Sequence, residues 1–415
     1  MRILDGLKKD QFVHTLERRG ANDLAEVEPA VRRIVNDVRR NGEPALRRYA
    51  RRWDDLAKDE AVRVPKADLR EAWQETSPEL QDAIAQAANN IRRYCEWQKP
   101  QEWRREIQSG VCVGQLVRPL ESVGCYVPGG RYPLPSTLLM TVIPAQVAGV
   151  PEIRVVSPRP AQATLAAAEF LGVREFYRVG GAQAIASLAY GTESIPRVSK
   201  IVGPGNRYVT AAKKLVAFDC GIEFLAGPTE AVFISEDGDP VFISCDLVAQ
   251  AEHDPDALCI LITSSRTLAK AVQKQVRRSA RANPIAAKSL SNNGAILLVD
   301  SLDQAVETAN RIAPEHLTVP KALAGSVQNA GSVFLDEFTP QSAGDYISGP
   351  NHVLPTGAMA RVRGGLNVLD YVRIISCQEV SREGIRSIAP PAILLAEAEG
   401  LHGHAESLRV RCANA

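Results

Sequence analysis

Short apolar segments with the character of β-strands alternate with helical segments over most of the chain. Strands and helices that take turns at this spacing form βαβ crossovers, which favour a parallel, doubly wound sheet. The alternation continues for long enough that we expect a second α/β domain. The expected strands are 111–127, 153–157, 176–179, 200–202, 231–235, 257–263, 295–299 and 332–335, and the first expected helices are 136–149, 161–171, 182–190 and 206–217.

The two ends of the chain have helical patterns instead. Before residue 105, apolar residues recur at helical spacing after Asn22-Asp23, which can cap a helix that Asn41-Gly42 ends. Basic pairs in this region, such as Arg51-Arg52, are interpreted as the solvated face of amphipathic helices, with no function assigned. After about residue 366 the pattern is helical again, up to Leu408. A helical tail of this kind either packs on a partner subunit or covers its own domain.

The composition excludes several classes of function. Lysine plus arginine (49) nearly balances aspartate plus glutamate (48) over 415 residues, so no net positive field attracts nucleic acid or an anionic membrane. The first residues carry charges where a secretory signal needs an apolar run, and no apolar stretch is long enough to span a membrane. We therefore expect a cytoplasmic protein. Its eight cysteines form no Cys-x-x-Cys motif and are expected to be free thiols.

Histidine, glutamine and carboxylate residues in the second half of the chain suggest a metal site. Gln250 and His253 are three residues apart on a predicted helix, so their side chains lie on one face. Together with Asp345 and His404 they supply two imidazoles, a carboxylate and an amide oxygen, a donor set suited to Zn²⁺. Spacing alone leaves open the alternative that each is an ordinary polar residue of the surface.

A second pair, Glu315-His316, follows a proline and is expected in the first turn of a helix. There the imidazole suits a general base, and the carboxylate can activate water. The alternative is a glutamate that favours a helix N-terminus, next to a packed histidine.

Three glycine-rich segments follow predicted strands and resemble loops that admit a nucleotide. Two of them open a helix, where backbone N–H groups can bind phosphate. None matches Gly-x-Gly-x-x-Gly, so a plain tight turn is the alternative, and the segments do not identify a cofactor. The segments are Val127-Pro-Gly-Gly130, Val179-Gly-Gly-Ala-Gln183 and Val202-Gly-Pro-Gly-Asn206.

An ordered set of motifs over nearly the whole chain resembles the histidinol dehydrogenase family. The motifs are Cys125-Tyr-Val-Pro-Gly-Gly-Arg-Tyr-Pro-Leu-Pro-Ser136, Gly203-Pro-Gly-Asn-Arg-Tyr-Val-Thr210, Gln250-Ala-Glu-His-Asp-Pro255, Ala313-Pro-Glu-His-Leu317, and Gly344-Asp-Tyr through Asn351-His-Val-Leu-Pro355. The resemblance implies oxidation of L-histidinol through histidinaldehyde to L-histidine, the last step of histidine biosynthesis, with two NAD⁺ and one Zn²⁺ per site.

The resemblance also implies an architecture. It predicts an α/β homodimer with two incomplete Rossmann-like parallel-sheet domains, an N-terminal helical segment and a C-terminal helical arm exchanged with the partner. The expected boundaries are 1–24 for the N-terminal segment, 25–125 with 230–366 for a discontinuous catalytic domain, 126–229 for the domain that contacts NAD, and 367–415 for the arm.

Carried over to this sequence, the resemblance assigns roles to single residues. The zinc ligands, which also contact substrate, are Gln250, His253, Asp345 and His404. His316 is the general base and also touches substrate, and Glu315 activates water. The other substrate contacts are His352, Glu399 and Thr229. The NAD contacts are Tyr126, Gln183 and Asn206. Thr229 departs from the serine expected at its place, which keeps the hydroxyl but adds a methyl group and puts the substrate fit in question.

Other functions fit part of this pattern. A relative with the same fold and zinc could oxidise another alcohol, such as a sulfonated diol, although His352 and Glu399 suit an imidazole and an ammonium group. A zinc hydrolase could use Glu315 as its base without a dinucleotide, and a non-catalytic protein could bind the metal alone. A thiohemiacetal on Cys125 or Cys112 is conceivable, but buried free cysteines are usually inert.

Overall fold

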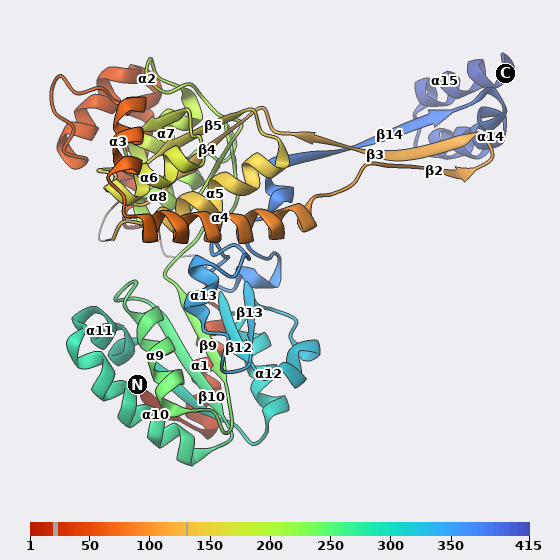
Figure 1. Ribbon diagram of the computed structural model, residues 1–415. Coiled ribbons are helices and arrows are strands. Elements are labelled where there is room, and N and C mark those ends of the chain that lie inside the picture. Colours follow the sequence, from red (N-terminus) through yellow and green to blue (C-terminus); the bar gives the residue numbers. More distant parts are fainter. Residues whose placement is uncertain (20–23, 130–131) are drawn as a thin grey trace.

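The computed structural model describes residues 1–19, 24–129 and 132–415, and it shows two α/β units and a projecting arm (Figure 1). One sheet has five strands in the order β6-β5-β4-β7-β8, and the other has six in the order β1-β11-β10-β9-β12-β13. Every pair of neighbouring strands in both sheets is parallel. The two parallel sheets agree with the α/β fold expected from the alternation of apolar and helical segments.

The five-stranded sheet lies between two groups of helices. Its strands are β4 (Ser122–Tyr126), β5 (Glu152–Val156), β6 (Glu175–Tyr177), β7 (Lys200–Val202) and β8 (Gly221–Ile222). The crossover helices are α5 (Pro135–Ala148), α6 (Gln162–Phe170), α7 (Gly181–Tyr190) and α8 (Arg207–Val216). We call this sheet, with the helices that cover it, the five-stranded unit.

Three helices from the first hundred residues complete the five-stranded unit. They are α2 (Glu28–Trp53), α3 (Lys66–Gln74) and α4 (Pro78–Gln98). Val31 and Leu46 of α2 share a core with Ile185 of α7, and Ile91 of α4 shares a core with Leu139 of α5. The expected grouping of residues 25–125 with residues 230–366 therefore differs from the structure, because these helices bury their apolar faces on the other sheet.

The six-stranded unit contains the start of the chain and residues 230–346. Its strands are β1 (Arg2–Leu4), β9 (Glu230–Ile234), β10 (Leu258–Thr263), β11 (Ala295–Leu298), β12 (His316–Val319) and β13 (Ser332–Leu335). Its helices are α1 (Gly6–Glu17), α9 (Pro240–Ala251), α10 (Arg266–Ser279), α11 (Pro284–Asn292), α12 (Leu302–Ile312) and α13 (Gln341–Tyr346), with 3₁₀ turns η1 (Ala280–Ala282) and η2 (Lys321–Ser326). The N-terminal segment is thus no separate helical piece, since β1 pairs with β11 and Val13 packs in this core.

The arm is a long antiparallel ribbon with a pair of helices at its tip (Figure 1). It consists of β2 (Trp103–Gln108), β3 (Val111–Pro119), β14 (Val372–Val380), α14 (Arg382–Ala398) and α15 (His402–Ala413), and β14 follows 3₁₀ turns η3 (Met359–Arg361) and η4 (Val368–Tyr371). A purely helical arm over 367–415 was expected, so β14 corrects that prediction. The strand expected over 111–127 is two strands, because β3 belongs to this antiparallel ribbon and only β4 belongs to a parallel sheet.

The helix end predicted at Asn41-Gly42 is a kink inside a longer helix. Gly42 has a positive φ of 52° and marks a kink inside α2, where the sequence predicts a helix end. The predicted cap at Asn22-Asp23 lies outside the described residues. In the parts of the chain that the structure describes, no helix is both long and apolar enough to cross a membrane.

Candidate active site

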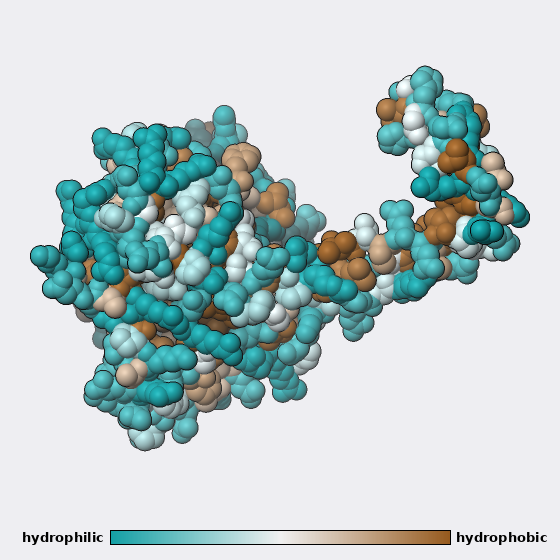
Figure 2. All heavy atoms as spheres, turned by 90° about the horizontal axis from the view of Figure 1, so that it is seen from above, coloured by the Kyte–Doolittle hydropathy of each residue, from teal (hydrophilic) through white to brown (hydrophobic). Residues whose placement is uncertain are grey.

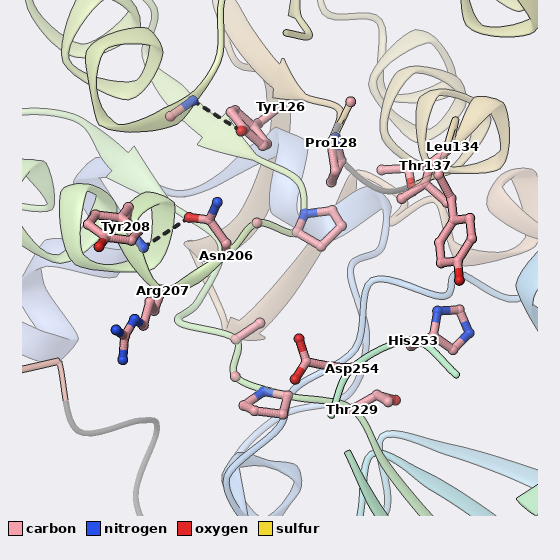
Figure 3. A pocket seen from close by; sticks show the side chains of 18 of the residues that line it. Tyr126, Pro128, Leu134, Thr137, Asn206, Arg207, Tyr208, Thr229, His253 and Asp254 are labelled. Carbon is pink, nitrogen blue, oxygen red and sulfur yellow. Dashed lines mark hydrogen bonds between the residues drawn. The ribbon is translucent and has the colours of Figure 1, made fainter. Parts of the chain in front are cut away.

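A cleft of about 1560 Å³ lies where the two units meet. Its walls come from α2, α5, α7 and α8 on one side, and from α9, β12, α13 and the loop after α13 on the other. Tyr126 and Asn206 reach it from the five-stranded unit, and Thr229 and His253 approach from the six-stranded unit (Figure 3).

The cleft brings together all but two of the residues predicted for the site. Those that line it are Tyr126, Gln183, Asn206, Thr229, Gln250, His253, Glu315, His316, Asp345 and His352. Glu399 and His404 do not line it, because they lie at the end of α14 and in α15 at the tip of the arm, where both are exposed.

Glu315 and His316 stand at the beginning of a strand and not in the first turn of a helix. Helix α12 ends before Ala313, which has the left-handed φ of 52°, and His316 is the first residue of β12. The prediction was wrong because the proline at 314 was taken as a helix start, whereas the run after it is a buried parallel strand. Glu315 is held from one side: its Oε2 accepts hydrogen bonds from Thr229 Oγ1 at 2.6 Å and from the Glu230 backbone N–H at 2.9 Å.

His316 is buried between two carboxylates. Its Nδ1 lies 3.5 Å from Glu315 Oε2, its Nε2 lies 3.7 Å from Asp345 Oδ1, and its ring stacks on Phe334. Burial alone would lower the pKa of His316, but Glu315 and Asp345 outweigh burial and raise it to about 10. In the described structure Nδ1 has no hydrogen-bond partner, so this atom is available for an exchangeable proton.

His352 is held in one neutral form. Its Nδ1–H donates to the backbone oxygen of Asp345 at 2.8 Å, and Nε2 then accepts from Thr137 Oγ1 at 3.1 Å. Burial lowers the pKa of His352, which favours the neutral imidazole. Thr137 was not predicted, although it directly follows the motif that ends at Ser136.

The predicted metal donors that line the cleft lie at or near the C-terminal ends of two helices, α9 and α13. Gln250 is buried in the last turn of α9, whereas His253 lies beyond the end of the helix on which it was predicted, and both line the cleft. Asp345 belongs to α13, and the hydrogen bond and charge of His316 hold its pKa low although burial would raise it. Among the described residues, no group of three or more histidines, cysteines, aspartates or glutamates could hold a metal ion. The predicted donors that line the cleft of one chain are an amide, an imidazole and a carboxylate, one fewer than the four ligands of a tetrahedral zinc site.

The three predicted NAD contacts lie at the other end of the cleft. Tyr126 Oη accepts a hydrogen bond from the Gly181 N–H, and Asn206 caps α8 by accepting from the Tyr208 and Val209 N–H groups (Figure 3). Gln183 donates from Nε2 to Asp54 Oδ2 at 2.9 Å. Asp54 was not predicted, because it ends an ordinary amphipathic helix. Gly129 lines the cleft, while Gly130 of the same predicted loop lies outside the described residues.

A family model described as histidinol dehydrogenase matches residues 17–412. This chain belongs to the histidinol dehydrogenase family. It is 45% identical to histidinol dehydrogenase of Methanothermobacter thermautotrophicus, with 96% of each chain covered, and 44% identical to that of Aquifex aeolicus, with 99% of each covered. A crystal structure of histidinol dehydrogenase from Elizabethkingia anophelis superimposes with a TM-score of 0.93 at 33% identity, covering 100% of this chain and 98% of the other.

Membership of the histidinol dehydrogenase family makes the chain an oxidoreductase and associates it with histidine biosynthesis. Its cysteines give no support to a thiohemiacetal route. Burial raises the pKa of the Cys125 thiol to about 12, so this thiol stays protonated, and Cys112 lies in the arm strand β3.

Proposed function

We propose that this protein oxidises L-histidinol to L-histidine through L-histidinaldehyde and passes one hydride to each of two NAD⁺ molecules. The observation that carries the proposal is the single cleft in which Glu315, His316 and His352 stand beside the predicted zinc donors. The same cleft continues to Tyr126, Gln183 and Asn206, which leaves room for a dinucleotide next to the reacting carbon.

We propose that Gln250, His253 and Asp345 hold one zinc ion together with His404 from a second copy of the chain. The mixed nitrogen and oxygen donors fit Zn²⁺, and His404 would supply the fourth donor that a tetrahedral site needs. A bound zinc ion would polarise the hydroxyl oxygen and hold nitrogen atoms of the substrate.

The surroundings of His316 and Glu315 suit two successive proton transfers. In the first oxidation, His316 would accept the hydroxyl proton while the C–H hydrogen leaves as hydride to NAD⁺. A cation beside Asp345 would offset the negative charge that raises the pKa of His316, and so favour the unprotonated base. In the second oxidation, Glu315 would take a proton from the water that adds to the aldehyde, and the hydrated carbon would give a hydride to the second NAD⁺.

Glu315 is oriented for this second task. Its Oε2 is fixed by Thr229 and by the Glu230 N–H, while no donor among the described residues contacts its other oxygen, Oε1. Thr229 supplies the hydroxyl group that this contact needs, so the methyl group that distinguishes it from serine does not remove the contact. Both ring nitrogens of the neutral His352 are paired within the chain, so a substrate donor that binds His352 would take the place of Thr137 at Nε2.

We propose a homodimer in which the arms are exchanged. The arm projects from the two units of its own chain, and in a single chain it exposes apolar side chains to water (Figures 1 and 2). They include Ile107, Ile374, Leu394, Leu395, Leu401 and Val410. Placing an arm on a second copy would bury this surface and carry Glu399 and His404 toward a cleft.

The direct test is purified protein with L-histidinol and NAD⁺, followed by the absorbance of NADH. We expect two NADH for each L-histidine formed, loss of activity after chelation, and recovery when zinc is added. Oxidation of a sulfonated diol but not of L-histidinol would mean that the substrate is another alcohol. Hydrolysis without formation of NADH would refute the proposed dehydrogenase activity. His253→Ala protein that is fully active without bound metal would refute the metal site.

A further inference from the structure

The N-terminus of helix α7 is already occupied by side chains of the protein itself. In parallel α/β folds, the first backbone N–H groups of such a helix commonly bind a phosphate group of the ligand. Here the Gly180 N–H donates to Asp54 Oδ2 at 3.0 Å, and the Gly181 N–H donates to Tyr126 Oη at 3.1 Å. A carboxylate from the end of α2 thus takes the place that an anionic ligand would occupy.

The same carboxylate oxygen also fixes the side chain of Gln183. Asp54 Oδ2 accepts from Gln183 Nε2 at 2.9 Å, and Asp54 and Gln183 are both buried at the wall of the cleft. A carboxylate can only accept hydrogen bonds, so the amide nitrogen faces Asp54 and the amide oxygen faces away from it. No donor in the described parts of the chain contacts Gln183 Oε1, which leaves an unpaired acceptor beside Gly181.

We infer that Asp54 is a positioning residue of the dinucleotide site. Asp54 occupies the N-terminus of α7, so that phosphate does not bind there, and it turns Gln183 Oε1 toward a hydrogen-bond donor of the cofactor. The donor is a hydroxyl or amide NH₂ group, because an acceptor oxygen beside a carboxylate repels phosphate. This inference rests on the proposed function, since it assumes that a nicotinamide dinucleotide occupies the cleft. It gives the glycine-rich segment at 179–183 a different role from the phosphate loop that its sequence suggests.

The inference predicts a particular pattern of cofactor affinity. In Asp54→Ala protein the Gln183 amide is free to turn, so the dissociation constant of NADH and the KM for NAD⁺ should rise about tenfold while kcat changes much less. Asp54→Asn should recover most of the lost affinity, because one amide oxygen can accept from both Gly180 and Gln183. Asp55→Asn removes the same charge one residue away on the surface, and should leave NADH binding as in the wild type.

A double-mutant cycle separates positioning from a direct contact. Gln183→Ala alone should weaken NADH binding about tenfold, and Asp54→Ala combined with it should weaken binding no further. NADH affinity is measured by fluorescence titration, with the melting temperature and the KM for L-histidinol recorded for each variant. Losses that multiply to about a hundredfold in the double variant would overturn the inference.

Failure of the inference and failure of the proposed function give different results. Wild-type protein that neither binds NADH nor reduces NAD⁺ would remove the cofactor and both conclusions with it. Wild-type protein that binds NADH, with Asp54→Ala binding it as tightly, would overturn the inference alone. The same holds if Asp54→Asn is as weak as Asp54→Ala, because charge and not orientation would then be decisive.

Discussion

Glu315 and His316 are neighbours in the sequence, but at the start of β12 their side chains contact different partners. Glu315 accepts from Thr229 and from the backbone at 230, whereas His316 lies between Glu315 and Asp345. Their proposed roles belong to different halves of a four-electron oxidation, and this makes the roles separable by experiment.

Glu315→Gln keeps the size and the hydrogen bonds of the side chain but removes the base. Oxidation of supplied histidinaldehyde should therefore slow by about 10²- to 10⁴-fold. His316→Asn should instead slow the first oxidation of L-histidinol, with partial recovery at high pH, and affect the aldehyde half less. Stopped-flow measurement of NADH from each substrate separates the two effects. Equal losses in both halves for both variants would show that the roles are divided wrongly.

The raised pKa of His316 predicts how the stability of metal-free protein depends on pH. The folded-state pKa of about 10 lies above the ordinary value of 6.5, so the stability that protonation contributes is fully present below pH 6.5 and is lost as pH rises toward 10. Chelated wild type should therefore lose stability between pH 7 and 9 more steeply than His316→Asn, by roughly 1 kcal/mol per pH unit. Urea unfolding at several pH values measures this, and parallel curves would contradict the predicted charge state.

At the scale of elements, a buried ion pair anchors the loop between β7 and α8. Lys213 Nζ donates to Glu223 Oε1 at 2.6 Å and to the Gly203 carbonyl, and the Gly203 N–H donates to the same Glu223 oxygen. Gly203 has a φ of +113°, and a Cβ there would lie 2.1 Å from the Tyr126 carbonyl oxygen. Only glycine fits this position, three residues before the predicted NAD contact Asn206.

Replacing this pair separates stability from cofactor binding. Lys213→Met leaves Glu223 buried without its partner and should cost about 3 kcal/mol of unfolding free energy. Lys213→Met with Glu223→Leu should regain much of that stability, yet its KM for NAD⁺ should stay raised because the Gly203 peptide is no longer held. Thermal melting and steady-state kinetics give both quantities. A double variant with the wild-type KM would show that the pair does not position the loop.

Elements with strong local signals were predictable, and those that depend on distant contacts were not. The apolar runs at 153–157 and 257–263 form buried strands between helices, as their composition indicates. Strand β14 was missed because its side chains are mostly exposed in one chain and lack the clear alternation of a half-buried strand. The place of α2, α3 and α4 on the five-stranded unit was missed because periodicity marks an apolar face but does not say which sheet covers it.

The same limit applies to the cleft. Gln250, His253, Glu315, Asp345 and His352 were found through motifs, because those residue types in that order indicate a chemistry. Asp54 and Thr137 were not found, because their contacts at the cleft are with partners 129 and 215 residues away in the sequence. A single aspartate at a helix end or a threonine in an apolar helix gives no signal of its own in the sequence.

At the scale of the whole molecule, the residues predicted for one site are divided between the cleft and the tip of the arm. Each chain holds Gln250, His253, Asp345 and His316 at the cleft, while its own His404 is exposed on the arm. If the arms are exchanged, every working site combines the cleft of one chain with the arm of the other.

This arrangement predicts activity from a mixture of two inactive proteins. His404→Ala leaves the cleft intact but spoils the arm, and His316→Ala does the reverse, so a dimer containing one of each has one complete site. Random subunit exchange makes about half of the dimers mixed, and the mixture should therefore reach about a quarter of wild-type activity. Mixing His404→Ala with Glu399→Ala is the matched control, because both defects lie on arms and no complete site can form. No recovery in proven mixed dimers of the first pair would mean that each site is built within one chain. Recovery in the control pair would mean that Glu399 and His404 of one arm serve different clefts, which would contradict the exchange of the whole arm.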